Sequence, residues 1–187
     1  VSTNTAINRL VDCVSRALDG SHRAVGVLCD LSKAFDCVNH DILVSKLLRY
    51  GIKDKELSWF TTYLANPKQR TVITKSGITE KSGWSDVSFG VPQGSVLGPC
   101  LFIMYVNDLS AATNMNIIQY ADDTTLICEG PGTDLGWAFV TEEMDSLGDW
   151  FAVNGLAMNV SKTQVIEFSA SPRVNSSGTI QSNSTNL

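Results

Sequence analysis

The sequence predicts an α+β fold in which helices cover a β-sheet. Helical and strand-like segments follow one another without the regular strand–helix–strand alternation of a parallel sheet. The chain has 187 residues, of which 43% are apolar, and this is sufficient for one domain with a sizeable core.

No run approaches the ~20 apolar residues that a membrane span needs, and no signal peptide opens the chain. We therefore expect an intracellular protein that is neither secreted nor attached to a membrane.

Apolar side chains three and four residues apart indicate the helices. This spacing predicts helices over 6–18, 41–50, 55–65, a segment with Pro99 in its first turn, and 133–153. Gly20 and Gly51 follow the first two helices, and Asn154–Gly155 supplies a left-handed stop for the last. Asp54 is the predicted N-cap of the third helix.

The strands are indicated by short β-branched and apolar runs. They are predicted within 24–31, 69–88, 116–127 and 156–168. Ser76–Gly77 and Ser82–Gly83 are predicted turns inside the second of these segments. The third divides into two short strands around Asp122–Asp123, and the fourth is predicted to form a final strand pair.

The charge balance is acidic, with 14 basic and 19 acidic residues and a net charge of -5. Proteins that bind nucleic acid usually present a basic face. Either the partner is not nucleic acid, or the basic segments lie elsewhere in a longer protein.

The five cysteines are scattered and form no C-x-x-C pair. This predicts neither a disulfide framework nor a zinc site, and it indicates a reducing compartment.

The two ends of the chain suggest a fragment of a longer protein. The chain begins at Val1 and ends in a Ser- and Asn-rich stretch that can bury little surface. We predict one folded domain over 1–169 and a polar, disordered tail over 170–187.

Three acidic residues lie where predicted strands end or turn, namely Asp30, Asp122 and Asp123. Carboxylates brought together from two strands suit a hard cation such as Mg²⁺, which takes oxygen ligands from one or two carboxylates and from substrate phosphates. Adjacent residues of a strand point to opposite faces, so a tight turn is needed if Asp122 and Asp123 share one site. The alternative is that Asp122–Asp123 is only a solvated turn.

Four segments in order carry a family resemblance. They are Asp30 to Asp36 (DLSKAFD), Gly90 to Pro99 (GVPQGSVLGP), Tyr120 to Asp123 (YADD) and Asn159 to Thr163 (NVSKT). Over about residues 1–168 the chain resembles the reverse transcriptases of non-long-terminal-repeat retrotransposons. Telomerase and group II intron reverse transcriptases match these four motifs less well. Viral RNA-dependent RNA polymerases more often carry Gly-Asp-Asp than Tyr-Ala-Asp-Asp.

This resemblance implies a polymerase palm, with an antiparallel sheet that carries the acidic site and packs against helices. It implies that Asp30 and Asp122 bridge two Mg²⁺ ions, with Mn²⁺ as an alternative, and that Asp123 completes the acidic site. Lys162 resembles a lysine that donates a proton to the leaving pyrophosphate, although a surface lysine beside a strand is the alternative. The implied partners are an RNA template, a DNA primer and deoxynucleoside triphosphates.

The resemblance also implies three nucleotide-binding residues. Phe35 matches the position whose ring lies under the sugar and excludes a 2′-hydroxyl, and core packing is its alternative role. Gly94 would let the nucleotide approach the backbone, and Gln93 would offer it an amide; a plain turn is the alternative for this segment. Asp36 is assigned a structural role, and His40 is assigned no catalytic role.

The leading hypothesis is therefore an RNA-directed DNA polymerase that acts in the nucleus. The main alternative is a decayed or partial element that folds but does not polymerise. A phosphohydrolase with paired aspartates is disfavoured, because the histidine-rich or further acidic motifs of such sites are lacking. In this family the fingers residues that grip the triphosphate lie upstream of the first motif and the thumb lies beyond Phe168, so the isolated chain is expected to be inactive.

Overall fold

The computed structural model describes residues 2–65, 68–130 and 135–170. The chain forms two compact units. We call Val1–Ala34 together with Val106–Leu187 the sheet unit, and Phe35–Tyr105 the insert unit. The predicted tail falls almost wholly outside the described residues, as do the first two residues of the helix predicted over 133–153.

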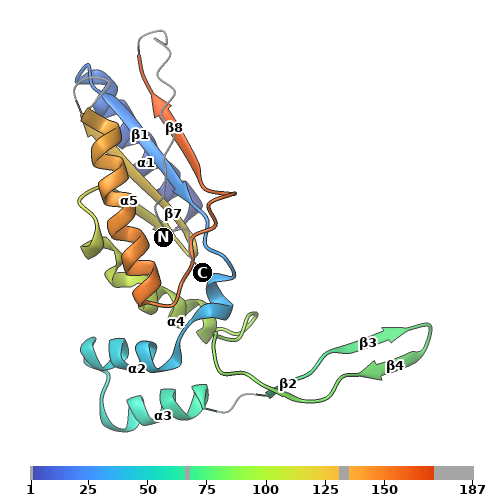
Figure 1. Cartoon of the computed structure of the whole chain (residues 1–187). Helices are drawn as coiled ribbons and strands as arrows, with labels where there is room; N and C mark the ends of the chain where they lie inside the picture. The colour runs from blue at the N-terminus through green and yellow to red at the C-terminus, as the bar shows by residue number, and fades with distance from the viewer. Residues whose placement is uncertain (1, 66–67, 131–134, 171–187) are drawn as a thin grey trace. The chain divides into compact units, whose positions relative to one another are not determined.

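The sheet unit contains one four-stranded antiparallel sheet, in the order β6-β7-β1-β8 (Figure 1). Its elements are α1 (Thr3–Asp19), β1 (Arg23–Cys29), η2 (Asn107–Ala112), β6 (Asn116–Tyr120), β7 (Asp123–Gly130), α5 (Leu135–Val153) and β8 (Gln164–Phe168). Mixed helices and antiparallel strands confirm the predicted α+β class.

Strand β1 lies at the centre because it is apolar on both faces. It pairs with β7 on one side and with β8 on the other, and most of its residues are buried. At its outer end Arg23 forms a 2.6 Å ion pair with Glu167 of β8. An uninterrupted apolar run is what a strand covered on both faces requires.

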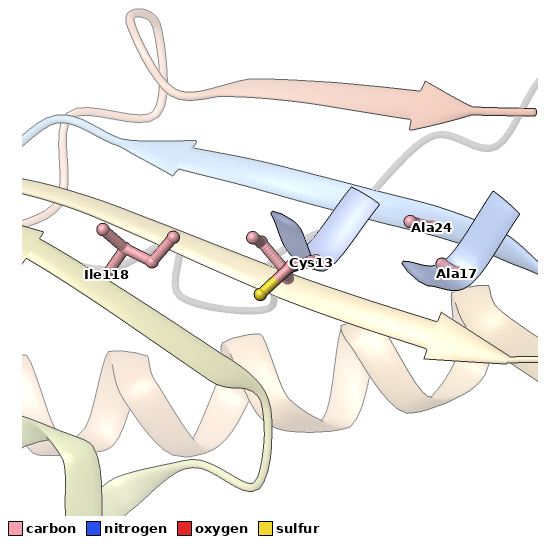
Figure 2. Close-up of a cluster of buried hydrophobic side chains, with 5 residues drawn as sticks. Cys13, Ala17, Ala24 and Ile118 are labelled. Carbon is pink, nitrogen blue, oxygen red and sulfur yellow. The ribbon is translucent and has the colours of Figure 1, made fainter. Parts of the chain in front are cut away.

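Helices α1 and α5 both pack on this sheet. Figure 2 shows Cys13 and Ala17 of α1 beside Ala24 of β1 and Ile118 of β6, all of them in one buried cluster. Residues of β7 alternate in direction, so Ile127 joins this cluster while its neighbours Leu126 and Cys128 point to the opposite face. Among the described residues no helix is both long and apolar enough to cross a bilayer.

The insert unit contains two packed helices, α2 and α3. Its elements are η1 (Ala34–Cys37, whose first residue belongs to the sheet unit), α2 (His40–Arg49), α3 (Asp54–Leu64), β2 (Lys68–Gln69), β3 (Val72–Lys75), β4 (Ile78–Lys81), β5 (Ser85–Asp86) and α4 (Leu97–Val106, whose last residue belongs to the sheet unit). Asn39 caps α2, because its side-chain oxygen accepts from the amides of Asp41 and Ile42. The predicted N-cap of α3 was wrong: Lys53 occupies that position without a side-chain hydrogen bond, and Asp54 begins the helix.

Strands β2 to β5 form one long hairpin, residues 68–86, which we call the ribbon. Ser76 and Gly77 both have positive φ and close a two-residue turn between β3 and β4, as predicted. Ser82–Gly83 is not a turn, which corrects the prediction: the Ser82 amide donates to the Thr71 carbonyl, and the Thr71 amide donates to the Ser82 hydroxyl. Beyond it Gln69 pairs with Ser85 in a separate ladder, so the two residues 70–71 face the three residues 82–84 between the two ladders.

The predicted strand pair over 156–168 is only partly present. One strand, β8, pairs with β1, and Met158 makes an isolated bridge to Leu31. Between them Asn159 holds a turn, because its carbonyl accepts from the amides of Lys162 and Thr163. The segment therefore meets residues 30–32 at one isolated bridge and then turns, and it does not form a second strand.

The buried carboxylate of Glu143 in α5 forms hydrogen bonds with the segment before β6. Glu143 is 6% exposed and accepts hydrogen bonds from the Thr113 hydroxyl, the Asn114 amide and the Asn114 side chain, at 2.6 to 2.9 Å. Burial alone would raise the pKa of this carboxyl, but the hydrogen bonds outweigh it and hold the pKa below the ordinary 4.5.

We predict that Glu143→Gln lowers the free energy of unfolding by about 1 to 3 kcal/mol. The side-chain NH₂ group of glutamine would face groups of Thr113 or Asn114 that now donate hydrogen bonds to the carboxylate. A carboxyl with a lowered folded-state pKa stabilises fully above its unfolded pKa and loses that contribution as the pH falls through the folded value. The unfolding free energy should therefore fall in acid for the parent chain and less for the variant, measured by urea denaturation at pH 7 and at pH values below 4.5. Exposed Glu142→Gln is the matched control, and an equal loss there would contradict this role for Glu143.

Candidate active site

The predicted acidic residues lie at one end of the β1–β7 pair. Asp30 directly follows β1, Asp122 lies in the turn between β6 and β7, and Asp123 begins β7. The last paired residues are Cys29 and Thr124, so the same register continued by one residue would set Asp30 opposite Asp123, at the roughly 5 Å that separates paired Cα atoms. The two motif strands are neighbours, as predicted.

The turn that carries Asp122 is tight and strained. Tyr120 pairs with Asp123, which leaves only Ala121 and Asp122 to reverse the chain. Ala121 has φ +54°, a left-handed conformation that is unfavourable for any residue with a Cβ. The sequence required a tight turn at this point, and the backbone supplies one.

The fourth motif lies against Asp30. The Asn159 amide donates to the Asp30 carbonyl at 2.7 Å, and the Ser32 amide donates to the Ala157 carbonyl at 2.8 Å. These bonds bring the Lys162 ammonium to 3.8 Å from the Asp30 carboxylate. The two side chains are 69% and 36% exposed, so water screens the pair and it contributes little stability.

Cys29 immediately precedes Asp30 but does not add a nucleophile to the site. Burial raises the pKa of its thiol to about 12, so the thiol stays protonated at neutral pH.

The donor set suits a hard cation. Asp122 and Asp123 are exposed and Asp30 is half-buried, so all three carboxylates are accessible. Within the described ranges no three acidic, His or Cys side chains gather as a ready-made metal cage. Mg²⁺ is commonly bound through one or two carboxylates together with substrate phosphates, and the residues present fit that mode of binding.

The predicted nucleotide-binding residues lie in the insert unit. The Phe35 ring is half-buried and stacks on Phe102, with centroids 4.5 Å apart. This contact keeps the core-packing role open alongside the predicted sugar contact. Gly94 is exposed and has φ +81°, which a glycine adopts without strain.

Gln93 is held by the first motif. Its side-chain amide donates to the Asp36 carboxylate at 2.9 Å, which fits the structural role predicted for Asp36. The Gly90 amide donates to the Val38 carbonyl at 2.7 Å, and the His40 imidazole bonds the Gly90 carbonyl at 2.8 Å.

Gly90 is the position that permits this contact. Its φ is +90°, and a Cβ there would lie 2.9 Å from backbone atoms of Asp36. Sequence reasoning missed Gly90 and the structural contact of His40. The available signal was a glycine directly before Val-Pro-Gln-Gly, where only a residue without a side chain allows two backbones so close.

Comparison with known proteins identifies the family. A family model described as "Reverse transcriptase (RNA-dependent DNA polymerase)" matches residues 5–182, so the chain belongs to the reverse transcriptase family. The predicted resemblance to the non-long-terminal-repeat type is confirmed by the relatives. The chain is 26% identical over 184 residues to the RNA-directed DNA polymerase from mobile element jockey of Drosophila melanogaster, and 27% identical over 176 residues to the probable RNA-directed DNA polymerase from transposon BS of the same species.

These alignments cover 89% and 87% of this chain but 18% of each relative, so the chain spans about a fifth of their length. Among solved structures, it is similar to apo telomerase from Candida tropicalis truncated from its C-terminal domain, with a TM-score of 0.63, 16% identity, and coverage of 92% of this chain and 36% of that one. This likeness confirms the predicted polymerase palm fold.

We predict that Ala121→Gly raises the free energy of unfolding by about 0.5 to 1 kcal/mol, because relief of the left-handed strain exceeds the entropy cost of glycine. Chemical denaturation would measure the change. Ala111→Gly, an exposed alanine that does not have a positive φ, is the control and should destabilise. Destabilisation by both changes would contradict the strain at Ala121.

Proposed function

We propose that this chain carries the catalytic carboxylates of an RNA-directed DNA polymerase, which transfers deoxynucleotides to the 3′-hydroxyl of a primer. The observation that carries the proposal is the β1–β7 register, which sets Asp30 beside the Tyr-Ala-Asp-Asp turn. Membership of the reverse transcriptase family supports this reaction class.

Asp30, Asp122 and Asp123 would hold two Mg²⁺ ions, with Mn²⁺ as a substitute. When bound, such ions lower the pKa of the primer hydroxyl and neutralise charge on the triphosphate and the leaving pyrophosphate. The chain's own task is to hold the carboxylates side by side, although like charges repel one another. The pairing of Tyr120 with Asp123 closes the turn that carries Asp122 and would hold it near Asp123 despite that repulsion.

Lys162 would donate a proton to the leaving pyrophosphate. Its ammonium lies 3.8 Å from the Asp30 carboxylate, which places it beside the proposed metal site. The exposure of its side chain leaves it accessible to a phosphate.

In the insert unit, Phe35 would contact the sugar and Gly94 would let the nucleotide approach the backbone. The hydrogen bond to Asp36 uses the side-chain nitrogen of Gln93, so the side-chain oxygen of Gln93 is presented as an acceptor. We propose deoxynucleoside triphosphates, an RNA template and a DNA primer as partners, in the nucleus, with fingers and thumb supplied by further segments.

We predict that Asp122→Asn abolishes nucleotide incorporation with little loss of folding. A suitable test replaces the matching segment of the jockey polymerase by this chain and measures primer extension on an RNA template in Mg²⁺. Incorporation should fall on the order of a thousandfold, since a metal site contributes several kcal/mol, and stability should change by less than about 0.5 kcal/mol.

Exposed Asp145→Asn is the matched control and should keep the activity of the chimera. If Asp122→Asn kept that activity, the metal assignment would be wrong. A folded chimera that is inactive beside an active jockey parent would instead favour the decayed-element alternative.

We predict that Phe35→Val in the same chimera admits ribonucleotides, because a smaller side chain leaves room for a 2′-hydroxyl. The ratio of ribonucleotide to deoxynucleotide efficiency should rise by about tenfold or more. Phe35→Tyr keeps the ring and should leave the ratio unchanged. Phe102→Leu removes the buried ring that stacks on Phe35 and leaves Phe35 itself unchanged. A rise in the ratio for Phe102→Leu equal to that for Phe35→Val would assign Phe35 a packing role.

We predict that the 187-residue chain by itself extends no primer. It corresponds to 18% of the jockey relative, and its net charge of -5 opposes binding of a phosphate backbone at physiological salt. Primer extension on a poly-ribonucleotide template measures this. Synthesis above the level of an Asp122→Asn control would show that the palm needs less from its neighbours than proposed.

A further inference from the structure

The ribbon differs in charge from the rest of the chain. Residues 68–86 carry the four cations Lys68, Arg70, Lys75 and Lys81 and two carboxylates, Glu80 and Asp86, which gives a net charge of +2. Since the whole chain has a net charge of -5, the remaining residues carry -7. Cations are therefore concentrated on one element of an otherwise acidic protein.

Every residue of the ribbon is exposed. In Figure 1 strands β3 and β4 extend away from helices α2 and α3 of the same unit. The apolar side chains of Val72, Ile73 and Ile78 are 49 to 66% exposed, so they do not build a core. A two-stranded ribbon of this kind is marginally stable alone, and its exposed surface suits contact with a partner.

Between the two ladders of the ribbon, a cation lies over an aromatic ring. The Arg70 guanidinium lies 4.5 Å from the centroid of the Trp84 ring, and Trp84 is 62% exposed. This exposure rules out core packing for Trp84. An accessible indole beside an arginine offers a base a stacking surface and its phosphate a positive charge.

The two carboxylates reduce this charge only in part. Asp86 lies 3.5 Å from the Lys68 ammonium at the base of the ribbon, while Glu80 pairs across the strands with Ile73. Arg70 lies between the two ladders, and Lys75 and Lys81 lie farther along the ribbon. Cations spaced along an extended element, with one aromatic ring between them, match the repeat of phosphates and bases in a single strand.

We infer that the ribbon, residues 68–86, binds single-stranded nucleic acid, with Arg70, Lys75 and Lys81 on phosphates and Trp84 stacked on a base. The inference rests on the proposed function for its partner class, since a polymerase must hold a template. It goes further in assigning a binding surface outside the acidic site. It explains why an acidic chain carries a basic exposed element.

The first test measures stacking in the 187-residue chain without metal or nucleotide. Fluorescence anisotropy with labelled oligonucleotides of about 12 residues, oligo-dT and oligo-rU in separate arms, gives the dissociation constants. Trp84→Leu should weaken binding about tenfold in both arms, and Trp84→Phe by less than about threefold, because stacking needs an aromatic ring. Trp59→Leu changes another exposed tryptophan of the insert unit and should have no effect.

The second test measures charge. Lys75→Gln with Lys81→Gln should reduce the slope of log affinity against log salt by about 1.4 between about 50 and 200 mM salt, as expected for two lost phosphate contacts on a single strand. Lys53→Gln with Lys55→Gln removes the same charge from exposed positions outside the ribbon and is the matched control. All these substitutions are at exposed positions, and circular dichroism would verify the fold.

Equal effects of the ribbon and control substitutions would overturn the inference, as would the absence of binding at the lowest salt. Equally tight binding to a polyglutamate of the same charge, insensitive to Trp84, would show a general polyanion surface and also overturn it. If the ribbon substitutions weaken binding and the jockey chimera is inactive, the polymerase proposal alone is rejected. If the jockey chimera is active and the ribbon substitutions do not change binding, this inference alone is rejected.

Discussion

The antiparallel pairing of β1 with β7 is the constraint on which the candidate site depends. It brings Cys29 opposite Thr124 and so carries two acidic segments, distant in sequence, to one end of the sheet. Packing on both faces of β1 fixes the register, because a slip by one residue would put valines where the small residues Ala24 and Gly26 now fit against α1 and Phe168. Such a slip would also move Asp30 away from Asp123. The position of the carboxylates therefore follows from core packing and not from attraction between the carboxylates, which repel.

Most of the sheet unit could be predicted because its signals are local. An apolar run ending at Asp30, an acidic pair between two short strands, and Asn154–Gly155 after a helix each describe an element within a few residues. Gly155 indeed has φ +65° and ends α5. The type of fold and the approximate place of the three carboxylates followed from these signals together with the family motifs.

The predictions that were wrong depend on partners far away in sequence. Ser82–Gly83 has the composition of a turn, but Ser82 is hydrogen-bonded to Thr71 across the ribbon and the chain continues to β5 without reversing. The segment before β8 has a strand-like composition, but Asn159 bonds its neighbours and Asp30. Glu143 gave no sequence signal, because a glutamate on a helix is usually solvated and its three hydrogen bonds come from residues around position 114.

The compactness of the insert unit has a consequence for folding. Pairing of β1 with β7 closes a loop made of residues 30–123, and the entropy cost of closing a flexible loop rises with its length. The insert unit lies within that loop and is held by its own bonds, such as those of Gly90 with Val38 and of Gln93 with Asp36. If it condenses first, the flexible part of the loop becomes shorter and the long-range strand pairing becomes faster. In that case the segment that separates the acidic motifs in sequence would also help to bring them together.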